Sequence, residues 1–239
     1  LDETIARDLA TTLYHRSQRL GNNASSNQIE ETRNALEKAI ALNSNSDRIG
    51  LLSLYADFIA STESLRAVAI RQDIQRADPN NIENTILLGQ LAMEVAVKES
   101  RPEHKEAFFA IADSAFEQAK KIDPQDKRVL YQYAQYLRAR GQDEKAKALL
   151  EESQDEKLLW DHYFQQGQYE QARKILEQLY KKGTKDSAVI RGLLLIAEKT
   201  ADREAIKKHS EELNSLEDTF ENSFLQVRAY LMVGLVKEA

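Results

Sequence analysis

The stretch from residue 127 to residue 186 contains the same pattern twice, and this repetition constrains the fold more than any other feature. In each copy, apolar residues at helical spacing lead to a glycine, Gly141 or Gly167, and then to a short polar turn. A second helical pattern follows, with an alanine five residues after the glycine, Ala146 or Ala172. Apolar residues spaced by three and four predict helices with one buried face. Each copy therefore predicts two antiparallel helices joined at the glycine.

Similar helix pairs are predicted along the rest of the chain. Pro79 and Pro124 each end a pair, because proline cannot continue a helix and biases the preceding residue away from helical geometry. The expected repeats cover residues 1–46, 47–81, 82–126, 127–152, 153–186 and 187–218, with an incomplete one at 219–239. We treat them as one solenoid domain, and since the last repeat stops after its first helix, we expect a segment of a longer protein.

Three helix starts are expected from capping signatures, and one buried helix face from spacing. Asn27, Asn80 and Ser100 each have a glutamate three residues later, the pattern of a capping box. Near the start of the chain, Ile5, Leu9 and Leu13, with Leu20 as a further candidate, share one apolar helix face that is expected to be buried. An insertion around residues 99–106 lengthens the 82–126 repeat and predicts a projecting hairpin tip.

Composition supports an all-helical protein and excludes some kinds of site. The 239 residues include only 8 Gly and 3 Pro, so few positions interrupt a helix. Without Cys there is neither a disulfide nor a thiolate metal site. A formal net charge of −6 argues against binding a phosphate backbone, and we expect no nucleic-acid partner. No apolar run is long enough to predict a membrane span, and nothing decides between a cytoplasmic and a periplasmic location.

The pattern resembles the tetratricopeptide repeat family, whose unit of about 34 residues folds as two helices. Small residues occur where the helices of such a pair cross closely, and bulky residues occur between pairs. The small ones are Gly89, Ala67, Ala112, Ala134, Ala146 and Ala172; the bulky ones are Tyr55, Phe58, Phe116, Leu137, Tyr163 and Leu176. The chain departs from the family pattern with Trp160 at a usually small position, Thr184 in place of a proline and Ala201 in place of a turn glycine.

The resemblance implies an all-α, right-handed solenoid superhelix of about 13 helices that serves as a non-catalytic scaffold for proteins or peptides. It also implies that the first helix of each pair lines a concave groove. The positions that match are Leu52, Ala56, Ile86, Gln90, Met93, Arg128, Tyr131, Gln132, Gln135, Arg138, Lys157, Asp161, Phe164, Arg191, Leu195, Phe224 and Arg228. The lysine and asparagine set that grips chaperone tails in one subclass is absent from these positions, so a chaperone-tail adaptor is not expected.

No catalytic, metal or cofactor site is expected. The four histidines, His15, His104, His162 and His209, have no second histidine or carboxylate at a persuasive ligand spacing. Neighbouring residues on a helix point apart, so the pair Asp161 and His162 does not indicate a site. No phosphate loop, nucleophile elbow or calcium loop occurs. We therefore expect neither enzymatic activity nor a cofactor.

Several alternatives remain open. The chain could be a structural module that self-associates through an uncapped C-terminal end carrying Phe224, Leu231 and Met232, within an envelope or polysaccharide-export assembly. Aromatic pairs such as Trp160 and Tyr163 also resemble those of an RNA-binding half-repeat family, although the acidic balance disfavours RNA. The 99–106 tip is either a second contact surface or a tolerated insertion.

Overall fold

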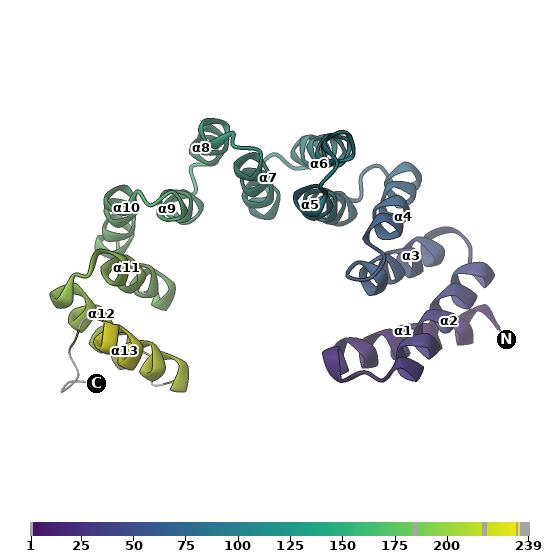
Figure 1. Ribbon diagram of the computed structural model, residues 1–239, viewed down its shortest axis with the longest axis horizontal. Helices are drawn as coiled ribbons and strands as arrows, with labels where there is room; N and C mark the ends of the chain where they lie inside the picture. Colours follow the sequence, from purple (N-terminus) through teal and green to yellow (C-terminus); the bar gives the residue numbers. More distant parts are fainter. Residues whose placement is uncertain (1, 184–185, 217–218, 233, 235–239) are drawn as a thin grey trace. The chain divides into compact units, whose positions relative to one another are not determined.

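The structure is a computed structural model that describes residues 2–183, 186–216, 219–232 and 234 (Figure 1). Over these residues the regular structure is entirely helical, with 13 α-helices and one short 3₁₀ turn. This confirms the predicted all-helical repeat fold. Thr184 and the end of the chain, residues 235–239, lie outside the described part, so the incomplete last repeat stays a prediction.

The chain divides into two compact units, Leu1–Ala146 and Lys147–Ala239, and each is described by itself. The first contains seven complete helices and the start of an eighth. They are α1 (Glu3–Leu20), α2 (Ser26–Leu42), α3 (Asn45–Ile59), α4 (Ser64–Ala77), α5 (Ile82–Lys98), α6 (Pro102–Ile122), α7 (Lys127–Ala139) and α8 (Asp143–Glu152). The second unit contains the rest of α8 with α9 (Glu156–Gln165), α10 (Tyr169–Lys181), α11 (Ser187–Thr200), α12 (Arg203–Leu216) and α13 (Phe220–Met232).

Successive helices in the first unit pack as antiparallel pairs. Helices α1 and α2, α3 and α4, and α5 and α6 form the pairs, and each pair also contacts the next one. In Figure 1, α3, α5 and α7 lie on one side of this layer, with α4 and α6 on the other. The buried core between the pairs is built from small and bulky apolar residues, including Ala10, Leu36, Tyr55, Ala67 and Leu88. The first helices thus share one face of the unit.

Two core clusters hold the second unit together. One lies between α10 and α11, where Ala172 and Leu176 are fully buried and Trp160 and Tyr163 of α9 pack against them. The other joins α11, α12 and α13, and its buried members include Ile190, Ile206 and Leu213. Apolar burial of this kind supplies most of the stability of amphipathic helices.

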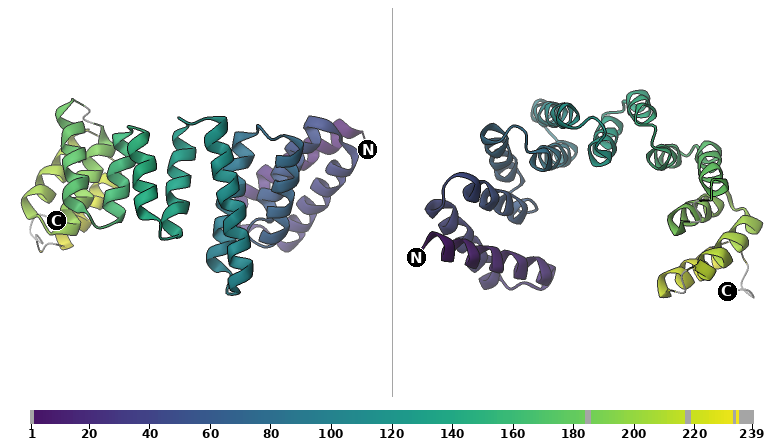
Figure 2. Two further views of the ribbon diagram at one scale, coloured as in Figure 1. Left: turned by 90° about the horizontal axis from the view of Figure 1, so that it is seen from above. Right: turned by 180° about the vertical axis from the view of Figure 1, so that it is seen from behind.

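The α5–α6 hairpin contains the two elongated helices that the insertion predicts. In the left view of Figure 2 it extends beyond its neighbours in the first unit. The helices cross closely at Gly89, where a Cβ atom would lie 2.7 Å from the Phe116 ring. Pro102 is at the start of α6, a position where its missing N–H is not needed. Glu99, rather than Ser100, accepts the backbone N–H of Arg101 at 3.0 Å, so the predicted cap at Ser100 is wrong.

The other two predicted caps are also displaced. Ser25, not Asn27, caps α2, and it forms a reciprocal capping box with Gln28. Asn81, not Asn80, caps α5 by accepting the backbone N–H of Asn84 at 3.0 Å. In both places several cap-forming residues stand side by side, and the residue that caps is the one whose backbone immediately precedes the first helical turn.

The predicted face of α1 is buried only in part. Leu13 is buried and Leu20 half-buried, but the expectation is wrong for Ile5 and Leu9, which are 58% and 47% exposed. Ala6 and Ala10 are buried instead. Helix α1 contacts both α2 and α3, and its buried residues are Ala6, Ala10 and Leu13. Helical spacing alone does not show which of its residues the neighbouring helices approach.

Candidate functional site

Helix α7 carries a row of half-buried side chains from the predicted groove. Asp126 caps the helix by accepting the backbone N–H of Arg128 at 2.8 Å. Val129, Leu130 and Leu137 are buried on the inner face. The opposite row is Arg128, Tyr131, Gln132, Gln135 and Arg138, and all but the exposed Arg128 are half-buried. The helical spacing of 131, 135 and 138 places an aromatic ring, an amide and a guanidinium together.

The two arginines of this row differ in how far their charge is neutralised. Arg128 pairs with Glu83 of α5 at 2.6 Å and with Asp126 at 2.8 Å. These carboxylates raise the pKa of Arg128, and Arg128 in turn lowers the pKa of Asp126. Arg138 donates to the amide oxygen of Gln135 at 3.3 Å and forms no ion pair with a residue that the structure describes. The charge of Arg138 is therefore still available to a partner.

The remaining predicted residues of the first unit lie on α3 and α5. Leu52, Gln90 and Met93 are half-buried at the surface. Ile86 is only 5% exposed and packs with Ile82, Ala119 and Val129, so it belongs to the core and does not line a surface. Ala56 is also fully buried. Ile86 contacts Val129 of α7, so it lies where two adjacent helix pairs meet.

On the second unit, α9 brings the predicted Phe164 into an aromatic group. The Phe164 ring lies 5.9 Å from the Trp160 ring and 5.6 Å from the Tyr169 ring, measured between centroids. All three residues are half-buried. Such a group offers a large contact area at low cost in conformational entropy, as aromatic residues do at binding sites.

The charged positions of the second unit are mostly used in local contacts. Lys157 pairs with Asp186 at 2.9 Å, which raises the pKa of Lys157 and lowers that of Asp186. Asp161 accepts from Gln165 at 3.5 Å. Arg191 donates to Asn222 at 2.8 Å, joining α11 to α13. The structure thus assigns Lys157 and Arg191 to contacts between successive first helices.

Helix α13 exposes apolar side chains at helical spacing. Phe224 is 58%, Val227 38% and Leu231 54% exposed. Arg228, on the same helix, pairs with the largely buried Glu198 at 2.8 Å. The three apolar residues form an exposed surface of the second unit, which we call the α13 face.

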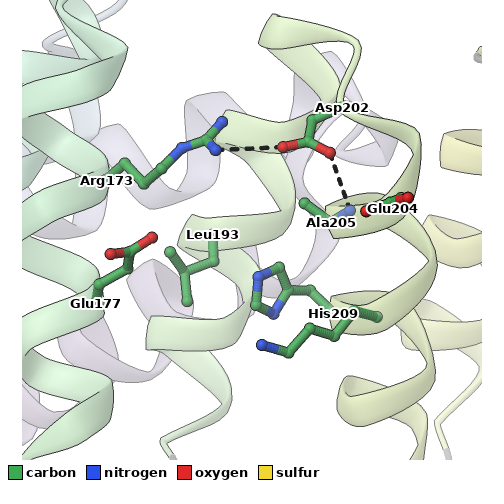
Figure 3. Close-up of a pocket in the computed structure, with 8 residues that line it drawn as sticks. Arg173, Glu177, Leu193, Asp202, Glu204, Ala205 and His209 are labelled. Carbon is green, nitrogen blue, oxygen red and sulfur yellow. Dashed lines mark hydrogen bonds and ion pairs between the residues drawn. The ribbon is translucent and has the colours of Figure 1, made fainter.

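A pocket that the sequence did not indicate lies among α10, α11 and α12. Arg173 spans one end and pairs with Asp202 at 3.2 Å (Figure 3). Leu193 and His209 reach into it, and the Glu177 carboxylate faces them from α10. Glu204, Ala205 and Lys208 complete the lining, and the free volume is about 290 Å³. Arg173 and His209 are far apart in sequence, so spacing cannot show that they meet.

Other kinds of site are not found in the part of the chain that the structure describes. None of its clusters of three or more acidic or histidine side chains could hold a metal ion. None of its helices is both long enough and apolar enough to cross a membrane.

The comparisons with known proteins identify the fold. No family model and no curated protein match the sequence. A thermophilic TPR protein of Thermus thermophilus, TTC0263, is similar over 80% of this chain and 97% of its own, with a TM-score of 0.54 and 16% identity. Pseudomonas aeruginosa PilF is similar over 95% and 99%, with a TM-score of 0.55 and 17% identity.

PilW, described as a widely conserved type IV pilus biogenesis factor, is similar over 82% of this chain and 91% of its own. Its TM-score is 0.52 and its identity is 14%. At such identities the likeness establishes architecture and not function. Together with the paired helices and the close crossing at Gly89, it shows that the chain has the tetratricopeptide repeat fold.

Proposed function

We propose that the chain is a non-catalytic scaffold that binds a peptide or protein segment across its first helices. The proposal rests on α7, where Tyr131 and Gln132 stand beside a guanidinium, that of Arg138, whose charge no described carboxylate neutralises. An extended segment offers backbone carbonyls and carboxylates to such a group and apolar side chains to the tyrosine. On the second unit, Phe164 with Trp160 of α9 and Tyr169 of α10 is a separate candidate contact.

The two arginines of α7 provide a matched test. A peptide would first be selected from a displayed random library against the full chain, and its Kd would then be measured by fluorescence anisotropy. Arg138→Gln and Tyr131→Ala are each expected to weaken binding about tenfold, the effect of losing a contact worth about 1.4 kcal/mol. Arg128→Gln is the control, because its charge is already held by Glu83 and Asp126.

The affinities of these variants distinguish binding at α7 from binding at α9. Equal affinity for Arg138→Gln, Tyr131→Ala and the wild type, with unchanged helical circular dichroism, would contradict binding at α7. In that case Phe164→Ala on α9 shows whether the peptide uses the second unit. If none of these variants changes the affinity of any selected peptide, the first helices do not form the peptide-binding surface.

A second candidate function is self-assembly, which the α13 face favours. Phe224 and Leu231 are both more than half exposed and lie on one helix, and apolar faces of this kind commonly pack against another helix. PilW is described as a pilus biogenesis factor, and a role in an envelope or polysaccharide-export assembly is the corresponding proposal here. Sedimentation over a range of concentrations tests it: a mass that does not rise, or that rises equally in Phe224→Ser/Leu231→Ser, rejects it.

RNA binding is the least favoured function. The formal net charge of −6 opposes association with a phosphate backbone. Absence of binding to single-stranded RNA at low salt would dismiss it.

A further inference from the structure

Two sets of polar contacts join α10 to the α11–α12 region around the pocket. At one end Arg173 pairs with Asp202 at 3.2 Å and also donates to the Thr200 hydroxyl at 3.0 Å. Next to the lining residues Lys208 and His209, the Tyr180 hydroxyl donates to Glu212. Side chains of α10 are therefore linked to the α11–α12 region in two places. A pocket framed in this way needs little rearrangement to accept a ligand.

His209 is the most buried polar group of the lining, with 9% of its surface exposed. Its Nδ1 lies 3.4 Å from Glu212 Oε2. An ionised carboxylate can only accept, so Nδ1 carries the hydrogen and, in the neutral ring, Nε2 has a free lone pair. Burial, the largest influence, lowers the pKa of His209 and keeps the ring neutral near pH 7. The far edge of the ring points into the pocket toward Leu193 and Glu177 (Figure 3).

The charges of the residues that line the pocket also favour a ligand that donates hydrogen bonds. The charge of Arg173 is already held by Asp202, and the ammonium group of Lys208 lies 5.9 Å from the Tyr180 ring centroid. Glu177 and Glu204 form no ion pair within the described residues. With two cations, three carboxylates and a neutral histidine, the lining has a net charge of −1. The acceptors left for a ligand, Glu177, Glu204 and His209 Nε2, thus outnumber the one cation of the lining without a carboxylate partner among the described residues, Lys208.

We propose that this pocket binds a lysine or arginine side chain of a partner protein. The aliphatic stem would lie on Leu193 and Ala205, and the cationic head would donate to the Glu177 carboxylate and to His209 Nε2. A carboxylate ligand would be attracted by Lys208 but repelled by the Glu177 carboxylate and by the Nε2 lone pair beside which it would have to lie. All but one of the lining residues on helices belong to the second helices α10 and α12, and the exception, Leu193 on α11, is not a predicted groove residue. The site is therefore distinct from the first-helix surface proposed above and would give the scaffold a second point of attachment.

The test is a titration of the full chain followed by NMR of the histidine rings. The probes are N-acetyl-lysine methylamide and N-acetyl-arginine methylamide at low salt, with the norleucine and glutamate derivatives as controls. The chain has 4 histidines, and His209→Gln identifies the His209 signal by its loss. Before addition, the ¹⁵N shift of Nε2 is expected to be that of an unprotonated nitrogen. A protonated Nε2 in the free protein would overturn the proposal.

The lysine and arginine probes are expected to shift the His209 signal in a saturable way. The norleucine and glutamate derivatives are expected to leave this signal unchanged. Glu177→Gln should weaken both cationic probes about tenfold, as loss of a charge-assisted hydrogen bond does. Glu170→Gln, an exposed carboxylate on the same helix, is the control and should bind as the wild type does. Both glutamates are exposed, so neither substitution is expected to unfold the chain.

Affinity should also fall as the pH is lowered, since a protonated His209 loses its lone pair. The groups that face the ring are Glu212 and Lys208 on its own helix and Arg173 and Glu177 on α10. The proposal fails if the cationic probes give no saturable shift, if glutamate or norleucine binds equally, or if Glu177→Gln binds like Glu170→Gln. Tyr131→Ala, on the other unit, leaves these results unchanged, so the two proposed sites are tested independently.

Discussion

The buried guanidinium of Arg71 donates to the side-chain oxygen of Asn84 at 3.1 Å, and the Asn84 amide donates back to the Arg71 carbonyl at 3.0 Å. Both side chains are 2% exposed. Arg71 also pairs with Asp57 of α3. One arginine on α4 therefore connects three successive helices, α3, α4 and α5, through polar contacts inside the first unit.

Replacing Arg71 with methionine should destabilise the first unit by about 2 kcal/mol. The apolar stem is retained, but Asn84 loses its guanidinium partner in a place that water does not reach, and a buried polar group left unsatisfied costs about 1–3 kcal/mol. Urea unfolding followed by circular dichroism measures the change.

Arg76→Met on the same helix is the matched control. Arg76 pairs with Asp73, but the two side chains are 75% and 59% exposed, and exposed pairs contribute about 0–1 kcal/mol. If Arg71→Met were no less stable than Arg76→Met, the polar contacts of Arg71 would not stabilise the fold.

Gly89→Ala is expected to destabilise the chain, although alanine is the better helix former. The new Cβ would lie 2.7–2.9 Å from three atoms of the Phe116 ring. Phe116 is fully buried and stacks on Tyr133 with 5.7 Å between centroids, so the ring has little room to move. Overpacking costs about 1–3 kcal/mol, against about 1 kcal/mol gained from helix propensity.

Urea unfolding measures the effect of Gly89→Ala, and Gly50→Ala is expected to show the opposite effect in that measurement. Gly50 lies inside α3, and a Cβ there meets nothing within 4 Å. We expect this variant to be more stable by about 0.5–1 kcal/mol. A stabilising Gly89→Ala would show that the α5–α6 crossing adjusts without cost.

Residues in left-handed turns give a third pair of variants. Ala201 ends α11 with φ of 54°, where Gly141 and Gly167 end other first helices at 69° and 70°. A non-glycine residue in this conformation costs about 1–2 kcal/mol. Ala201→Gly should therefore raise the thermal midpoint, and Gly141→Ala should lower it. If both changes moved the midpoint in the same direction, backbone strain would not explain them.

The sequence predicted the repeat fold because each helix pair carries its own signals. The glycine turns at Gly141 and Gly167 and the small residue at Gly89 lie where the pattern placed them. Helix starts were harder to predict, since Ser25 and Asn27, or Asn80 and Asn81, satisfy the same capping chemistry. Of the predicted α1 face, Leu13 is buried while Ile5 and Leu9 are exposed, because spacing defines a helix face without showing which residues the neighbouring helices approach.

The predicted groove residues could be located on first helices, but their contacts depended on partners distant in sequence. Glu83 neutralises Arg128 from another helix, and this pairing is what distinguishes Arg128 from Arg138. The pocket was missed for the same reason, because Arg173 and His209 come from different helices. One local signal was present: Glu212 lies three residues after His209 and contacts it, a spacing that brings helical side chains together.

The burial of His209 makes part of the stability of the second unit depend on pH. Its pKa is lowered from 6.5 in the folded chain, chiefly by burial, while the nearby Glu212 partly opposes the shift. Above about pH 6.5 the ring is neutral in both states and contributes no difference. As the pH falls below that value, the unfolded chain binds the proton first, so the folded state loses stability.

Urea unfolding measures this dependence. The free energy of unfolding of the wild type should be lower at about pH 5.5 than at about pH 7.5, and His209→Gln should lose less stability over the same interval. His15→Gln, exposed on α1, should retain the wild-type dependence. A slope that His209→Gln leaves unchanged would mean that other groups account for it and that the ring is not held neutral by the fold.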